Sequence, residues 1–162
     1  TLKPFLATSR LAVQKVNGVA EMDYGNWSGK KLKILALKPA WKIIQRRPSA
    51  FRFPDGESFL EMNARAVSAV YELAKPGREI AICTHGDVIK ALLAHFSGEH
   101  MDTFQKWSID PASTTTIAIA ERSVKILKVN NTKYLGEVTA KPPRSVLGGG
   151  AGSTLKPKRS TR

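Results

Sequence analysis

Residues 79–98 read EIAICTHGDVIKALLAHFSG and predict a strand, a sharp turn and a helix in direct succession. The first six residues are mostly apolar, which is typical of a strand that is buried on both faces of a parallel sheet. The turn at His85-Gly86 leads into Asp87–Phe96, where apolar residues recur at helical spacing until Gly98 ends the pattern. A strand followed closely by a helix is the repeating unit of α/β folds.

A second helix is predicted immediately before this unit. Residues 53–56 (FPDG) have a turn composition, and Ser58 is followed three residues later by Glu61, which is the spacing of a capping box at a helix start. Apolar residues then recur on one helical face as far as Ala74, and a Pro-Gly pair ends the pattern. Helix, strand and helix in a row predict the α/β fold class, with a mostly parallel sheet between helices.

The flanking segments are predicted from weaker patterns. Leu11–Val16 is expected to form a short strand, and Leu32–Gln45 a helix that is interrupted or bent at Pro39. The alternating Thr and Ile residues of Ser113–Ala120 predict a strand, and Val124–Val129 predicts a second one. The short turn between these two strands favours antiparallel pairing near the C-terminal edge of the sheet.

Composition excludes several classes of protein. With 162 residues, of which 42% are hydrophobic and 24% charged, the chain fits one soluble globular domain. Apolar runs such as Ile80–Cys83 fall far short of the roughly 18 residues of a membrane span, so no membrane partner is expected. Cys83 is the single cysteine, which favours a reducing compartment and a cytoplasmic location. Residues 1–10 lack the apolar core of a secretory signal, and because the chain begins with Thr we expect its natural start to lie further upstream.

The formal net charge of +13 is unevenly distributed along the chain. Residues 141–162 carry six of the basic residues and no acidic one, within a sequence rich in Gly and Pro. This composition predicts a disordered basic tail, which leaves residues 1–140 as the folded domain. The charge of the tail allows contact with nucleic acid or acidic surfaces, but we expect a solvated tail and no nucleic-acid partner.

The first candidate site segment is Thr84–Asp87, at the carboxyl end of the predicted strand. Ligands of open α/β sheets bind at such ends, and the start of the following helix offers N–H groups and a partial positive charge to an anion. Gly86 would let the backbone approach a ligand closely. His85 could donate a hydrogen bond to a phosphoryl oxygen or titrate near neutral pH. The alternative, a histidine that only hydrogen-bonds the adjoining loop, stays open at this point.

The second candidate segment is Glu21–Gly29, whose glycines mark a loop. Glu21 and Asp23 lie close in sequence to Tyr24 and Trp27. A carboxyl group beside aromatic rings can have a raised pKa and so serve as a general acid. The residues alone favour the alternative, a polar surface loop held in place by the two aromatic side chains.

Taken in order, these motifs resemble those of the histidine phosphatase superfamily, the phosphoglycerate mutase-like proteins. Val19–Gly29 is similar to that family's Leu-x-Glu-x-x-x-Gly-x-x-x-Gly segment. Pro54–Ser58 is similar to its Pro-x-Gly-Glu-Ser turn, with Arg65 further along the helix, and Ile80–Gly86 to its strand ending in His-Gly. The resemblance extends over roughly residues 1–120 and implies a three-layer α/β/α fold.

The resemblance also implies an activity: phosphoryl transfer from a small phosphate ester through a phosphohistidine, without a metal or other cofactor. It makes His85 the second active-site histidine, Glu21 the proton donor and Tyr24 a substrate contact, beside the ligand contact expected at Gly86. That family's nucleophile lies in an Arg-His-Gly motif on the first strand, and the 162 residues contain no such tripeptide and no Ser-Ser-Pro-x-x-Arg segment. We therefore expect residues 1–140 to form a partial phosphoglycerate mutase-like domain without its first strand.

Several alternatives remain open. His95 and His100 have no neighbouring arginine and are interpreted as structural or solvated. The histidines and acidic residues do not have the spacing of metal ligands. A rival hypothesis is a non-catalytic protein that keeps Glu21 and His85 and binds an anion or a partner with its basic tail. The substrate, the choice between mutase and phosphatase, and assembly into a homo-oligomer are also open.

Overall fold

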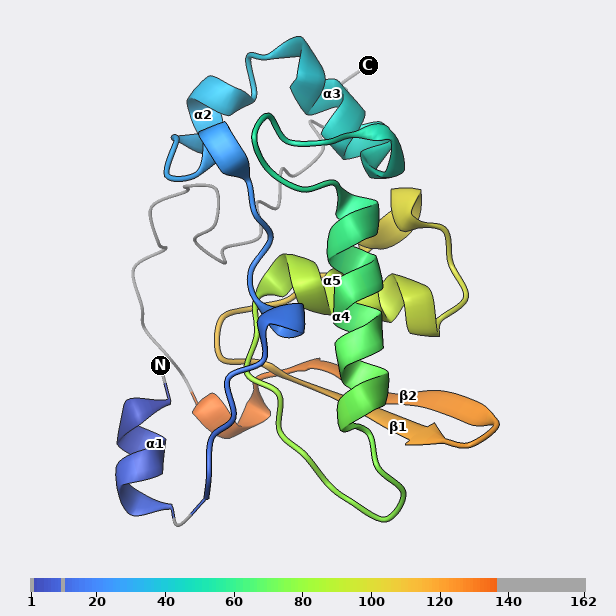
Figure 1. Cartoon of the computed structure of the whole chain (residues 1–162). Helices are drawn as coiled ribbons and strands as arrows, with labels where there is room; N and C mark the ends of the chain where they lie inside the picture. The colour runs from blue at the N-terminus through green and yellow to red at the C-terminus, as the bar shows by residue number, and fades with distance from the viewer. Residues whose placement is uncertain (1, 10, 137–162) are drawn as a thin grey trace, which may run out of the picture.

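Two packed helices, α4 (Phe59–Leu73) and α5 (Gly86–Phe96), form the centre of the molecule. The computed structural model describes residues 2–9 and 11–136, and Figure 1 shows α5 crossing behind α4 in the middle of the chain. Both helices begin and end within two residues of the bounds that the sequence predicts, so these two predictions are confirmed.

The start of α4 is fixed by a capping box. Glu61 donates its backbone N–H to Ser58 Oγ at 3.2 Å, and the backbone N–H of Ser58 donates to Glu61 Oε2 at 2.9 Å. A cap of this kind stabilises a helix by about 1 kcal/mol. The next turns of α4 bury Met62 and Ala66, which are fully inaccessible, towards α5 and the loops around it.

Shorter helices occupy the N-terminal part of the chain. α1 covers Lys3–Thr8, α2 Leu32–Leu35 and α3 Pro39–Arg46, with Pro39 at the start of α3. Proline lacks a backbone N–H and so suits the first turn of a helix, where that donor has no partner. The predicted interruption at Pro39 is therefore confirmed. Short 3₁₀ helices cover Asn17–Val19, Gly25–Trp27, Pro48–Ala50, Met101–Lys106 and Lys133–Leu135.

The sheet is a hairpin of two antiparallel strands, β1 (Thr114–Ala120) and β2 (Ser123–Asn131). Ile117 pairs with Ile126, and Ile119 with Val124, as expected for strands joined by a short turn. β2 contacts α5, which holds the hairpin against the helices. The two predicted C-terminal strands and their antiparallel pairing are confirmed.

The expected mostly parallel sheet is not found among the described residues, where β1 and β2 form the single sheet. Leu11–Val16 and the segment 79–84 were predicted as strands, but the structure assigns neither as a strand, and those two predictions were wrong. A strand exists only where a neighbour completes its ladder of hydrogen bonds, and neither segment has such a neighbour in the described part of the chain. The mixed α/β character of the fold remains.

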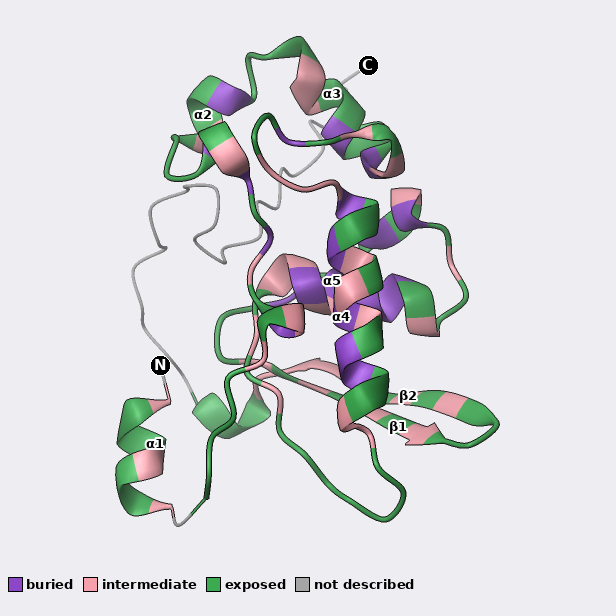
Figure 2. Cartoon of the chain, viewed as in Figure 1, coloured by how far each residue is buried: buried purple, intermediate pink, exposed green. Residues whose placement is uncertain are grey.

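The core lies where α4 meets α5 and continues into an aromatic cluster beneath the loop at residues 21–29. Phe53 is 1% exposed and stands at the centre of this cluster, with its ring 5.2 Å from Tyr24 and 5.5 Å from Trp27. In Figure 2 the buried residues concentrate around α4 and α5, while the hairpin is exposed or half-buried. The sequence interpretation that Tyr24 and Trp27 fix this loop agrees with their burial.

Residues 137–162 lie outside the described part of the chain, so the predicted basic tail at 141–162 stays a prediction. Within the described part, every helix is too short or too polar to cross a membrane.

Gly25 is expected to be the least replaceable glycine of this fold. Its φ is +48°, and a Cβ there would overlap the carbonyl oxygen of Pro54. Gly29, with φ of +71°, has open space where its Cβ would lie and is the matched control. Gly29→Ala should cost about 1 kcal/mol for its backbone conformation alone. Gly25→Ala should cost about 3 kcal/mol or more because backbone must also move.

Urea unfolding of both variants measures these losses. Equal losses at the two glycines would show that the contact between Gly25 and Pro54 does not constrain the loop.

Candidate active site

Arg65, in the middle of α4, fixes the loop that carries Glu21. Its guanidinium donates to the carbonyl oxygens of Gly18 and Ala20, both at 2.9 Å, and of Glu21 at 3.0 Å. The same group binds both carboxylate oxygens of Glu57, at 2.9 and 2.6 Å. A planar guanidinium can satisfy this many acceptors at fixed angles, which a lysine cannot. The backbone at Glu21 is therefore held by the helix.

Glu57 connects the turn at Pro54–Ser58, which precedes α4, to the same loop. Its Oε1 accepts the backbone N–H of Asp23 at 2.8 Å, and its own N–H donates to the carbonyl oxygen of Asp23 at 3.0 Å. One turn further on, the N–H of Asn26 donates to the carbonyl oxygen of Pro54 at 2.9 Å. These bonds join the turn before α4 to the 21–29 loop, so two of the three motifs of the sequence form one unit.

The segment Ile80–Gly86, which ends in the His-Gly pair, meets this unit where His85 contacts Glu21. Glu21 Oε2 lies 3.1 Å from His85 Nδ1, and Glu21 Oε1 accepts the backbone N–H of Met22 at 3.0 Å. Thr84 fastens the two segments together, since its hydroxyl donates to the carbonyl oxygen of Val19 at 2.6 Å. The structure thus brings together the two residues that the sequence nominates as catalytic.

Glu21 and His85 differ in their exposure. The Glu21 side chain is 21% exposed, whereas that of His85 is 50% exposed. His85 is the N-cap residue of α5, with extended backbone and no side-chain cap hydrogen bond, so it directly precedes the first N–H groups of the helix, which have no partner within the helix. A half-exposed histidine at this position can reach a ligand, in contrast to a histidine packed into a core.

Burial raises the pKa of the Glu21 carboxyl to about 7. The nearby charges of Asp87 and Glu57 raise the pKa further, while the Met22 N–H and the charge of Arg65 oppose the shift. At neutral pH a large fraction of Glu21 is therefore protonated. A carboxylic acid with a pKa near the working pH is suited to general acid catalysis.

Tyr24 is buried and its hydroxyl donates to Asp87 Oδ2 at 2.8 Å. Burial, followed by the charge of Asp87, raises the pKa of the Tyr24 hydroxyl well above its ordinary value. The other oxygen of Asp87 lies 3.8 Å from Nζ of Lys90, which is 9% exposed. Asp87 ends the candidate segment Thr84–Asp87 but was given no role in the sequence analysis, and Lys90 lay outside the candidate segments. The position of Asp87 directly after the His-Gly pair was the available signal.

Gly86 is the first residue of α5, and a Cβ on it would meet no described atom within 4 Å. The close approach of a ligand to Gly86 and the contact of Tyr24 with substrate both stay predictions. Among the residues that the structure describes, no group of three or more His, Cys, Asp or Glu side chains could hold a metal ion.

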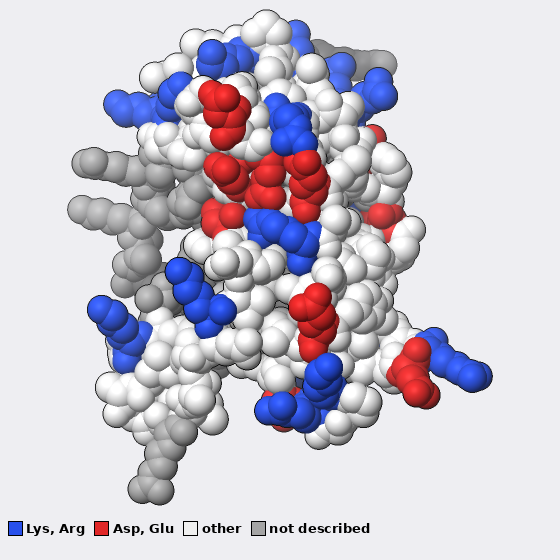
Figure 3. Space-filling view, viewed as in Figure 1, with Lys and Arg blue, Asp and Glu red and all other residues white. Residues whose placement is uncertain are grey.

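An open depression adjoins Glu21 on the side of Arg65, between the 21–29 loop and the start of α4. Carboxylates dominate it, and Figure 3 shows them gathered on one face around arginines. The charged lining residues are Glu21, Asp23, Arg52, Asp55, Glu57, Glu61 and Arg65. Because Arg52 and Arg65 are paired with Glu61 and Glu57, the carboxylates of this depression disfavour a phosphate group there.

The chain belongs to the histidine phosphatase superfamily (branch 1), whose family model matches residues 1–132. It is 27% identical over 139 residues to phosphoserine phosphatase 1 of Hydrogenobacter thermophilus, covering 78% of this chain and 62% of that protein. The resemblance drawn from the three motifs is thereby confirmed.

Solved structures of the same fold match as well. YhfR of Bacillus stearothermophilus is 25% identical with a TM-score of 0.64, over 69% of this chain and 58% of that one. A phosphoserine phosphatase variant from Entamoeba histolytica, in complex with phosphoserine, has a TM-score of 0.70 at 18% identity, over 78% of this chain and 66% of that one. The chain thus spans less than two thirds of the length of each of these relatives.

Glu21 should make the free energy of unfolding fall as the pH rises from about 4.5 to about 7. The folded-state pKa lies above the ordinary value, so the folded protein holds the proton more tightly than the unfolded chain. The resulting stabilisation is fully present below about pH 4.5 and is lost as the pH passes through 7. For a shift of this size the change is at most roughly 3 kcal/mol.

Urea unfolding at pH 4.5 and 7.5 measures this change, and Glu21→Gln should abolish most of it. Glu72→Gln, which replaces an exposed carboxyl on α4, is the matched control and should leave the pH dependence as it is. A Glu21→Gln variant with unaltered pH dependence would show that Glu21 has no raised pKa.

Proposed function

We propose that this chain carries the proton-donating half of a histidine phosphatase site and takes part in phosphoryl transfer from a small phosphate ester. The observation that carries the proposal is the contact of Glu21 Oε2 with His85 Nδ1 at 3.1 Å, at the start of α5. A raised pKa of Glu21, to about 7, supports the same role. The Hydrogenobacter relative is named a phosphatase, which favours hydrolysis over mutase activity.

In the proposed reaction a phosphoryl group binds beside His85 and the first N–H groups of α5. Hydrogen-bond donors at this place stabilise the charge that builds up on the phosphoryl oxygens during transfer. A histidine nucleophile, supplied by an Arg-His-Gly segment, forms a P–N bond while the P–O bond of the ester breaks. Glu21 gives its proton to the departing oxygen.

Water completes the proposed cycle. The Glu21 carboxylate takes a proton from the attacking water, a P–O bond forms, and the P–N bond to the nucleophilic histidine breaks. Inorganic phosphate leaves, and Glu21 is protonated again for the next turnover. Tyr24 orients this site through Asp87, since its hydroxyl bond holds the first turn of α5 against the 21–29 loop.

A chimera tests the proposal. A segment of a family member that contains Arg-His-Gly is joined ahead of Thr1, and hydrolysis of a panel of alkyl and aryl phosphate esters is compared with that of the 162-residue polypeptide. We expect the chimera to hydrolyse at least one alkyl phosphate and the polypeptide alone to hydrolyse none, because its sequence contains no such tripeptide.

Two results would overturn the proposal. Hydrolysis by the 162-residue polypeptide that is abolished by His95→Ala or His100→Ala would reveal a substitute nucleophile. A folded chimera that binds inorganic phosphate but hydrolyses no ester would favour the rival hypothesis of a non-catalytic anion-binding protein.

A further inference from the structure

Residues 28–47, which we call the basic cap, form one end of the molecule and contain α2 and α3 (Figure 1). The basic cap carries no acidic residue, and all of its basic side chains are exposed. Figure 3 shows Lys and Arg side chains along this end of the molecule. The basic residues are Lys30, Lys31, Lys33, Lys38, Lys42, Arg46 and Arg47.

Large aliphatic side chains stand among these cations. Leu37 is 85% exposed, Ile34 57% and Ile43 44%. They lie on α2, on α3 and on the turn between them, while Leu35 and Ile44 of the same helices are buried in the core. Single exposed aliphatic residues are ordinary, but several within one short cationic segment mark an interaction surface.

The combination of aliphatic and cationic side chains identifies the kind of partner. An anionic membrane surface accepts aliphatic side chains at its acyl boundary and lysines at its phosphate level. Nucleic acid would pair with the cations but offers nothing to Leu37, and the one aromatic residue of the basic cap, Trp41, is half-buried and not open to stacking bases.

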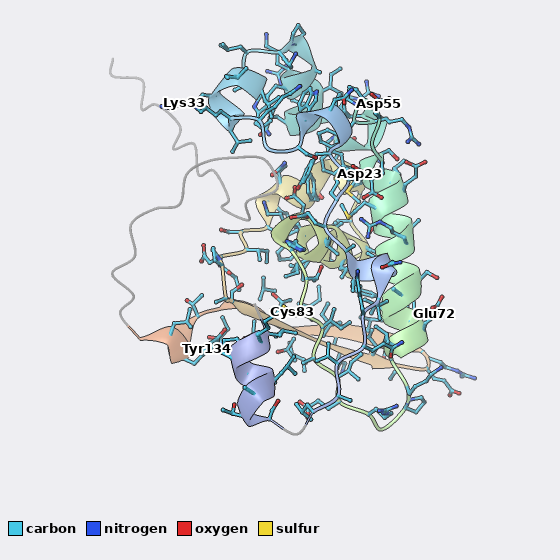
Figure 4. All side chains as sticks on the ribbon, turned by 60° about the vertical axis from the view of Figure 1, so that its left-hand side comes forward. Asp23, Lys33, Asp55, Glu72, Cys83 and Tyr134 are labelled. Atoms are coloured by element: carbon cyan, nitrogen blue, oxygen red, sulfur yellow. The ribbon has the colours of Figure 1, made fainter. Side chains whose placement is uncertain are left out.

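Charge separation in the molecule would orient it on such a surface. The carboxylates of the depression gather below the basic cap in Figure 3, and Figure 4 places Lys33 on α2 at the outer edge and Asp23 on the loop beneath it. An anionic surface attracts the lysines and arginines of the basic cap and repels the carboxylates of the depression. The basic cap would therefore face the membrane.

We propose that the basic cap docks the protein on anionic lipid surfaces through Leu37, Ile34 and the surrounding lysines. The expectation of no membrane partner was based on the length of apolar runs, which is a criterion for spanning a bilayer and not for lying on its surface. This proposal is independent of the proposed phosphoryl transfer.

Co-sedimentation of the 162-residue chain with vesicles tests the proposal. We expect binding to phosphatidylcholine vesicles that contain about 30% phosphatidylserine, no binding to pure phosphatidylcholine, and weaker binding at high salt. Lys38→Glu/Lys42→Glu should weaken binding more than tenfold, since each charge near such a surface contributes about fivefold. Ile34→Ser should weaken it severalfold at unchanged charge.

Matched variants elsewhere in the chain serve as controls. Lys125→Glu/Lys128→Glu changes the net charge by the same amount on exposed positions of β2, and Leu127→Ser removes an aliphatic side chain that is also 57% exposed. Lys156→Glu/Lys158→Glu changes the net charge by the same amount within the C-terminal tail. We expect each control to keep most of the binding, with circular dichroism verifying that all variants fold.

Three outcomes would overturn the proposal. Equal losses in the basic cap and the control pairs would mean adsorption by net charge alone, and a loss confined to the tail variant would move the contact to the tail. The absence of vesicle binding, together with binding of RNA that the basic cap variants abolish, would make the basic cap a nucleic-acid surface.

Discussion

Replacing His85 with Ala should lower the hydrolysis of phosphate esters by the chimera about 10²–10³-fold. The ring stands at the start of α5, where it would donate to a phosphoryl oxygen, and its Nδ1 contacts Glu21 Oε2 at 3.1 Å. Removing one preorganised donor to a developing negative charge has an effect of this size. Because the side chain is half-exposed, the thermal midpoint of unfolding should change little.

His95→Ala and His100→Ala are the matched controls for this measurement. Both side chains are exposed, and neither belongs to the Glu21–His85 contact. Steady-state kcat/KM of each control should stay within about twofold of the parent. Turnover that survives His85→Ala unaltered would remove His85 from the proposed site, whatever the stability of the variant.

The sequence predicts the helices of this chain because their signals are local. The capping box of Ser58 and Glu61, the Pro-Gly pair after α4, and Pro39 at the start of α3 each act within a few residues. The same holds for the β1–β2 hairpin, whose strands pair across a short turn. These elements carry their own start and stop signals.

The segments Leu11–Val16 and 79–84 show where such prediction fails. Their apolar patterns suit strands, but a strand also needs hydrogen-bond partners that lie far away in sequence. In the structure, the segment before His85 is tied by the Thr84 hydroxyl to the carbonyl oxygen of Val19 instead of by a strand ladder. Pattern alone identifies an apolar extended segment and not its pairing.

For the site, the order of the motifs predicted the family but not the contacts. Glu21 and His85 were nominated from separate motifs, and the structure brings them together. The bonds of Arg65 to three carbonyl oxygens and the Tyr24–Asp87 hydrogen bond had no local signal, because each depends on how a helix and a loop pack. Contacts of this kind follow from the tertiary structure.

Glu21→Gln in the chimera should lower turnover most for esters with poor leaving groups. The amide keeps the shape of the side chain but cannot give a proton to the departing oxygen. An alkyl phosphate releases a strongly basic alkoxide and depends on that proton, so kcat/KM should fall about 10²–10⁴-fold. An activated aryl phosphate releases a phenolate that needs no acid, and its kcat/KM should fall far less.

The pH profile separates this role from simple positioning. With the Glu21 pKa at about 7, turnover of the alkyl ester should decline as the pH rises above 7 and the acid form is lost. The Gln variant has no such acid and should lose this part of the pH dependence. Glu72→Gln, on the exposed face of α4, should preserve both the rate and the profile. Equal losses on alkyl and aryl esters, with an unchanged profile, would assign Glu21 to holding His85 in place, since the proton would then come from another group.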